Sequence, residues 1–117
     1  MTVWHNPRCS KSRGALEILD RAGVAYQVRR YLDDPPSVAE LEALLDKLAH
    51  EPRQMMRTNE ALYRELGLDE TSADRATLIR AMAEHPRLIE RPILICGTRA
   101  VVGRPSDRIA TFLQELD

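Results

Sequence analysis

The chain opens with an apolar run, a helical repeat and an alternating run. Residues 2–4 are Thr-Val-Trp, and apolar residues then recur at helical spacing from Ala15 to Ala22, ahead of Gly23, a residue typical of a helix end. Residues 24–31 alternate apolar and polar positions, as a half-buried strand does. Two strands joined by one helix normally lie parallel, so we expect a β-α-β unit with a right-handed crossover.

The middle of the chain carries only helical patterns. Ser37 and Glu40 have the spacing of a capping box, directly after a Pro-Pro pair that ends the preceding strand. Gly67 and Pro86 are expected to stop later helices. Four helical segments are predicted, over residues 38–48, 54–56, 61–66 and 74–84.

The last part of the chain predicts a hairpin followed by a helix. Residues 93–96 form a continuous apolar run, Gly97 and Thr98 make a turn, and residues 99–102 form the returning strand. The final helix is expected to turn four side chains inward: Ile109, Phe112, Leu113 and Leu116.

The predicted order of elements is β-α-β, a helical block, then β-β-α. This order is that of an α/β fold with a small mixed four-stranded sheet, the thioredoxin-like arrangement. We expect one domain over residues 1–117, with the helices at about residues 37–85 inserted between its two halves.

Composition limits the classes of function. The chain has 117 residues, 30% of them charged, and a formal net charge of −1, so it offers no general basic surface for nucleic acid or for a membrane. No run approaches the roughly 18 apolar residues of a membrane span, and no signal-like segment opens the sequence. We therefore expect a cytoplasmic monomer without nucleic-acid or membrane partners.

The two cysteines, Cys9 and Cys96, do not form a disulfide framework. Ser12 stands three positions after Cys9, so the C-x-x-C pattern of a dithiol oxidoreductase is absent there. Cys96 ends an apolar strand and is expected in the core. The three histidines lie far apart without metal-ligand spacing, so no metal site is predicted.

Cys9 stands where a strand, a tight turn and a helix meet. The free N–H groups and the positive dipole end of the helix stabilise negative charge at this position. Arg8, Lys11 and Arg13 add cations nearby. The Cys9 thiol should therefore ionise below the free-thiol pKa of about 8.5, at a place that also attracts a small oxyanion.

The segment His-Asn-Pro-Arg-Cys-Ser-Lys-Ser-Arg at residues 5–13 resembles the active-site loop of glutaredoxin-dependent arsenate reductases, the ArsC family. Further segments match the same family in the same order along essentially the whole chain. They are Tyr-Leu at 31–32, Pro-Pro-Ser at 35–37, Arg-Thr-Asn-Glu at 57–60, Tyr-Arg-Glu-Leu-Gly-Leu at 63–68, His-Pro at 85–86, Arg-Pro-Ile at 91–93 and Gly-Arg-Pro-Ser at 103–106.

The resemblance implies an enzyme with a single nucleophilic cysteine, Cys9. It also implies that His5 lowers the pKa of the thiol and that Ser12 hydrogen-bonds the thiolate. Three guanidinium groups, whose paired donors suit tetrahedral oxyanions, would hold the substrate: those of Arg57, Arg91 and Arg104. By fold analogy, Pro92 is a structural residue facing the cysteine, and its peptide isomer is left open by the sequence.

The reaction that the resemblance implies is reduction of arsenate to arsenite. Glutathione acts as co-substrate and glutaredoxin removes the glutathione left on Cys9, so no tightly bound cofactor is expected. Two alternatives stay open: a related glutathione- or thiol-dependent oxidoreductase with another substrate, and a transcription regulator of the same fold that binds RNA polymerase. A tyrosine-phosphatase-like site is excluded, because it needs an Arg six positions after Cys9, where Ala15 stands.

Overall fold

A computed structural model of the chain, which describes residues 1–116, divides into two compact units. The first unit combines Met1–Asp34 with the segment that starts at Arg91, and the second is Pro35–Glu90. The first unit holds all the strands of the sheet, and the second holds the helical block.

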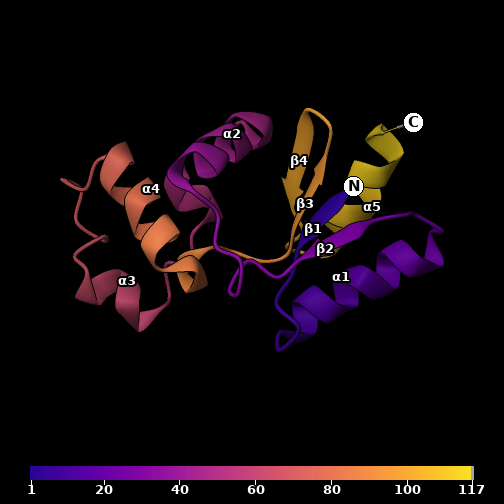
Figure 1. Cartoon of the computed structure of the whole chain (residues 1–117), viewed down its shortest axis with the longest axis horizontal. Coiled ribbons are helices and arrows are strands. Elements are labelled where there is room, and N and C mark those ends of the chain that lie inside the picture. The colour runs from indigo at the N-terminus through magenta and orange to yellow at the C-terminus, as the bar shows by residue number, and fades with distance from the viewer. Residues whose placement is uncertain (117) are drawn as a thin grey trace. The chain divides into compact units, whose positions relative to one another are not determined.

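The sheet of the first unit has four strands in the order β2-β1-β3-β4 (Figure 1). The central strand β1 runs parallel to β2 and antiparallel to β3, and β3 pairs antiparallel with β4. The strands are β1 (Thr2–Trp4), β2 (Gln27–Arg29), β3 (Ile93–Cys96) and β4 (Arg99–Val102). The mixed four-stranded thioredoxin-like fold predicted from the order of elements is confirmed, as is the hairpin.

Two helices, α1 (Ser10–Arg21) and α5 (Asp107–Glu115), complete this unit. Val3 and Leu94 are register partners on β1 and β3, so they point to the same face of the sheet. Both are fully buried, and residues of α1 and α5 pack with them. The resulting cluster consists of Val3, Ala15, Leu19, Leu94, Ile109 and Phe112.

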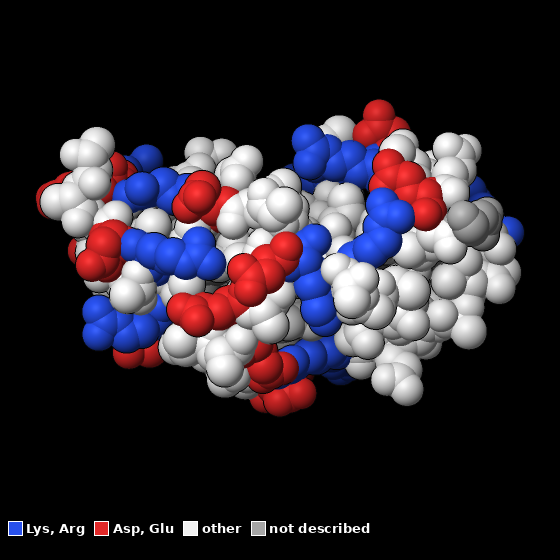
Figure 2. All heavy atoms as spheres, turned by 90° about the horizontal axis from the view of Figure 1, so that it is seen from above, with Lys and Arg blue, Asp and Glu red and all other residues white. Residues whose placement is uncertain are grey.

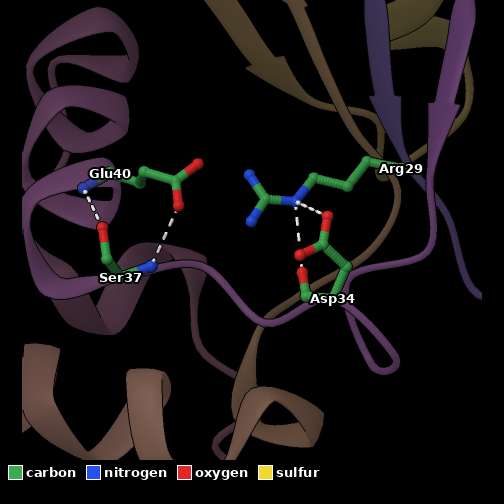
Figure 3. A network of polar contacts seen from close by, with 4 residues as sticks. All are labelled: Arg29, Asp34, Ser37 and Glu40. Carbon is green, nitrogen blue, oxygen red and sulfur yellow. Dashed lines mark hydrogen bonds and ion pairs between the residues drawn. The ribbon is translucent and has the colours of Figure 1, made fainter.

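Within the described residues, the second unit contains helices and an isolated antiparallel bridge between Met56 and Ile89. The capping box at the start of α2 is present: Ser37 Oγ accepts from the Glu40 N–H, and Glu40 Oε1 accepts from the Ser37 N–H, both at 3.1 Å (Figure 3). Asp74 likewise caps α4 by accepting from the Thr77 N–H at 2.9 Å. The helices are α2 (Val38–Leu48), η1 (Pro52–Met55), α3 (Ala61–Glu65), α4 (Arg75–Glu84) and η2 (Pro86–Leu88).

The strand predicted over residues 24–31 is only three residues long in the structure. Its N-terminal part follows the helix end instead, because the Val24 N–H donates to the Leu19 carbonyl at 3.1 Å. At its C-terminal end Tyr31 leaves the strand and stacks on Trp4, with ring centroids 6.5 Å apart. The predicted burial of alternate apolar residues is wrong within the strand, where Val28 is exposed and Arg29 is half-buried. The ends of the predicted strand pack against other parts of the unit instead of pairing in the sheet.

No helix within residues 1–116 is both long and apolar enough to cross a bilayer. On the face drawn in Figure 2, basic and acidic side chains alternate instead of gathering into one field of a single sign. This distribution agrees with the near-neutral charge of the sequence.

Candidate functional site

Cys9 is the N-cap residue of α1, with extended backbone angles (φ −99°, ψ 123°) immediately before the first helical residue. The turn before it is held by Asn6, whose carbonyl accepts from the Cys9 N–H and whose Oδ1 accepts from the Arg8 N–H, both at 3.0 Å. Pro7 occupies the bend between these two residues. The segment thus places the sulfur at the open end of the helix.

The pKa of the Cys9 thiol lies below its ordinary value. Partial burial by itself raises this pKa, but the amides of Ser12 and Lys11 and the guanidinium of Arg91 lower it by a larger amount. Arg91 acts both as a hydrogen-bond donor and through its charge. The N–H dipoles of the first helical turn favour the thiolate over the neutral thiol. These contacts favour the thiolate, the form in which a cysteine can act as a nucleophile.

His5 and Ser12 form a buried polar pair below this site, with 6% and 0% of their surfaces exposed. The Ser12 Oγ lies 2.7 Å from the His5 Nδ1 and accepts from the Asn6 N–H at 3.0 Å. The backbone of His5 is also held, since the His5 backbone N–H donates to the Arg29 carbonyl at 2.8 Å. The pair joins the end of β1, the loop and the first turn of α1.

The pKa of His5 is lowered, first by burial and then by the positive charges of Arg30 and Arg13, while a backbone hydrogen bond with Ser12 opposes the shift. The ordinary histidine pKa is about 6.5, so the His5 ring is neutral at pH 7. A neutral ring adds no positive charge beside the sulfur. The contact that His5 makes at this site is its hydrogen bond with the Ser12 hydroxyl.

Arg91 and Arg104 flank the two ends of the β3–β4 hairpin, one residue before Pro92 and one residue after Gly103. Both arginines are half-buried, and both belong to the same unit as Cys9. The Arg91–Pro92 peptide bond, whose isomer the sequence left open, is cis, and so is the Arg104–Pro105 bond. The structure thus brings Cys9, His5, Ser12 and Arg91 together in one unit.

Arg57 belongs to the second unit and is described within it. Its N–H donates to the Leu88 carbonyl at 2.7 Å, and its guanidinium pairs with Glu60 at 2.7 Å between Nη1 and Oε1. Both side chains of this ion pair are about a quarter exposed. Arg57 is therefore held in a defined position by a carboxylate partner.

Four exposed cations surround the Cys9 loop: Arg8, Lys11, Arg13 and Arg30. Arg13 is anchored by donating to the Pro7 carbonyl at 2.9 Å. Sequence reasoning did not include Arg30. The signal was available, because parallel β1 and β2 end at the same sheet edge, which brings the residues that follow Arg29 close to His5.

A cluster of side chains beneath the loop supports Trp4, the residue before His5. The Arg29 guanidinium lies 5.3 Å from the centre of the Trp4 ring, within cation–π range. Its Nε also reaches Asp34, donating to the backbone carbonyl at 3.2 Å with the carboxylate 3.4 Å away (Figure 3). These contacts fix the end of β1, from which the active loop departs.

Cys96 lies at the opposite end of the sheet from Cys9. In the antiparallel β1–β3 pair, Trp4 is opposite Ile93 and Thr2 is opposite Ile95, so Cys96 falls beyond the start of β1 whereas Cys9 follows its end. Three strand residues span about 10 Å, well beyond the Cα separation of about 4.4–6.8 Å in a disulfide. Cys96 is half-buried against the core cluster, rather than fully inside as expected.

No group of three His, Cys, Asp or Glu side chains within residues 1–116 has the arrangement of a metal site. In the first unit, the Cys9 sulfur lies beside the Arg91 guanidinium and the N–H donors at the start of α1. Such a centre suits nucleophilic attack on a small oxyanion.

Comparison with known proteins finds similarity over nearly the whole chain. The ArsC family matches residues 4–112. An arsenate reductase of Neisseria meningitidis is 48% identical over 112 residues, covering 95% of this chain and 96% of that protein.

Two solved structures resemble the whole chain. An arsenate reductase from Vibrio cholerae superposes with a TM-score of 0.90 at 47% identity, covering 95% of this chain and 97% of that one. A putative arsenate reductase from Yersinia pestis gives a TM-score of 0.89 at 45% identity over 94% and 97% of the two chains.

Proposed function

Since the chain belongs to the ArsC family, we propose that it reduces arsenate to arsenite, with Cys9 as the nucleophile. The observation that carries the proposal is the low pKa of the Cys9 thiol, maintained by the Arg91 guanidinium and the first amides of α1. These same groups suit a tetrahedral oxyanion. The relatives named as arsenate reductases supply the identity of the oxyanion.

In the proposed reaction the Cys9 thiolate attacks arsenic, an S–As bond forms, and one As–O bond breaks to release hydroxide that is protonated to water. Arsenic stays As(V) in this adduct. Glutathione then adds, and the two sulfurs supply two electrons as they join in a mixed disulfide, so arsenic leaves as As(III). Glutaredoxin reduces the mixed disulfide and returns Cys9 to the thiolate.

The arginines lower the repulsion between a thiolate and an anionic substrate. Arg91 is suited to this role because it already donates toward Cys9. Arg104, at the neighbouring end of the hairpin, is proposed as the second anion-binding group. The family resemblance assigns the third to Arg57, which is paired with Glu60. A planar guanidinium with two parallel donors is favoured over lysine for such an anion.

We propose an indirect role for His5 in activating the sulfur. Its neutral ring holds the Ser12 hydroxyl at 2.7 Å, and the Ser12 amide is among the groups that lower the pKa of Cys9. His5 therefore supports the thiolate by fixing the helical turn that faces it. Ser12 fills the position that a second thiol would occupy in a C-x-x-C enzyme.

The distance between the two cysteines supports an external reductant. Cys96 is at the far end of the sheet from Cys9, so Cys96 is not placed to resolve an adduct on Cys9. The family resemblance assigns the external reductant to glutathione and glutaredoxin.

The decisive experiment is a coupled assay of arsenate-dependent NADPH oxidation with glutathione, glutaredoxin and glutathione reductase, run beside a thioredoxin-coupled arm. We expect turnover only in the glutathione arm, no turnover by Cys9→Ser, and most of the activity in Cys96→Ser. Equal loss in both cysteine variants would contradict the single-thiol mechanism.

The same assay with other substrates separates the alternatives. Turnover of a small mixed disulfide without turnover of arsenate would replace the proposal with a different thiol-dependent oxidoreductase. Capture of RNA polymerase by a protein that does not turn over arsenate would favour the regulator.

A further inference from the structure

Gly103 occupies the point where the β3–β4 hairpin passes into the segment that carries Arg104. It is buried, and its N–H donates to the Pro92 carbonyl at 2.8 Å. The last paired residues of the hairpin are Ile93 and Val102. Pro92 and Gly103 are therefore the next pair beyond them, joined by one hydrogen bond because proline has no N–H to return.

Arg91 and Arg104 are the next residues along the chain from this pair, Arg91 before Pro92 and Arg104 after Gly103. The Gly103–Pro92 hydrogen bond thus lies directly between the sheet and the backbone of both arginines. Any shift of Pro92 relative to Gly103 should also move Arg91, because one peptide bond joins Arg91 to Pro92.

Gly103 is needed for close approach rather than for an unusual backbone angle. A Cβ at this position would lie 3.1 Å from Pro92 Cγ, 3.2 Å from Ile109 Cγ1 and 3.3 Å from Ile109 Cδ1. Ile109 is fully buried in the core cluster, and the proline ring cannot rotate away from its backbone. By contrast, a Cβ on Gly14 would meet no atom within 4 Å.

We propose that Gly103 is a positioning residue of the site. Because Gly103 has no side chain, Pro92 can pack against the end of β4 and the start of α5. This position of Pro92 determines where the Arg91 guanidinium meets Cys9. It also determines where Arg104 leaves the strand. The predicted effect of Gly103 on the ionisation of Cys9 depends only on the geometry of this unit. The predicted effect on arsenate binding rests on the function proposed above.

The test is Gly103→Ala, measured by the pH dependence of Cys9 alkylation with iodoacetamide, with Cys9 and Cys96 resolved by mass spectrometry. We expect the midpoint for Cys9 to move to higher pH, and the KM for arsenate to rise about three- to tenfold with a smaller change in kcat. Gly14→Ala is the matched control, because it adds the same methyl group where no atom is displaced.

A second control separates positioning from loss of stability. Ile109→Val weakens the same core by removing one methyl group and should leave the Cys9 midpoint unchanged. Should Gly103→Ala fail to fold, Ile109→Val is compared with the double variant Gly103→Ala/Ile109→Val. Valine removes the 3.3 Å contact with Cδ1 and leaves the contacts with a γ carbon at position 109 and with Pro92.

A wild-type alkylation profile in the folded Gly103 variant would overturn the proposal, whatever its activity on arsenate. A shifted profile in a protein that never turns over arsenate would support the positioning role and reject the proposed substrate. The two failures are therefore distinguishable.

Discussion

The Ser12 hydroxyl and the His5 imidazole meet at 2.7 Å in the interior of the unit that carries Cys9. Ser12 belongs to the first turn of α1, and His5 directly follows β1. Their contact therefore joins the strand to the helix whose N-terminus faces the sulfur. A buried polar pair of this kind stabilises one loop geometry, because leaving either partner unsatisfied costs about 1–3 kcal/mol.

The low pKa of His5 makes stability depend on pH in a defined direction. In the unfolded chain histidine takes up a proton near pH 6.5, whereas burial and the charges of Arg30 and Arg13 resist this in the folded state. The unfolded state thus binds more protons as the pH falls, so the free energy of unfolding decreases as the pH falls through the ordinary histidine range near 6.5. Denaturant titrations at several pH values measure this slope.

His5→Asn, which offers a polar atom near the same place without titrating, should flatten the pH dependence even if it lowers stability at pH 7. An unchanged slope in His5→Asn would mean that another group causes the acid sensitivity.

Removing the Arg91 guanidinium should weaken both the activation of the Cys9 thiol and the use of arsenate. In Arg91→Ala we expect the pKa of Cys9 to rise and kcat/KM for arsenate to fall at least about tenfold, equivalent to ~1.4 kcal/mol of transition-state stabilisation. Arg99→Ala is the control, because Arg99 is exposed on β4 and pairs with Glu115. A tenfold loss in both variants would indicate a general effect of charge or folding.

The exposed cations around the loop should make Cys9 selective for anionic reagents. Arg8→Gln/Lys11→Gln should lower the ratio of alkylation rates for iodoacetate and iodoacetamide by on the order of threefold, and about 0.5 M salt should remove most of the difference. Arg21→Gln is the control, since α1 has 12 residues and Arg21 ends it, about 17 Å from its start and beyond the Debye length of about 8–10 Å.

No effect of Arg8→Gln/Lys11→Gln on the rate ratio would mean that Arg91 and the helix amides alone set the local potential. A fall of the same size in Arg21→Gln would instead point to net charge rather than to the cations beside Cys9.

Local patterns predicted most elements of the fold because each carried its own stop signals. The strands at residues 2–4, 93–96 and 99–102 and the capping box at Ser37 have the predicted bounds. Cys9 could likewise be placed at a helix start, because the loop and the helical repeat adjoin it. The strand before Asp33 was overestimated, since alternation continues into residues that pack on Trp4 and α1 instead of pairing.

Long-range contacts could not be read from the sequence. Nothing in the spacing of Arg91 and Gly103 shows that the hairpin register places Pro92 against Gly103, and the resemblance alone named the arginines. Arg53 was missed altogether. Its three hydrogen-bond acceptors come from residues 63, 68 and 70, and no periodicity links them.

Arg53 should stabilise the second unit more than any exposed arginine there. Its guanidinium donates to the Tyr63 hydroxyl at 3.0 Å and to the carbonyls of Leu68 and Glu70 at 2.9 and 2.8 Å. Arg53→Met keeps the aliphatic stem but loses these donors, so we expect the free energy of unfolding to fall by about 2–3 kcal/mol. Arg64→Met, at an exposed position of α3, should change it by less than about 0.5 kcal/mol. Equal small effects of both substitutions in denaturant titrations would mean that water replaces the Arg53 donors without cost.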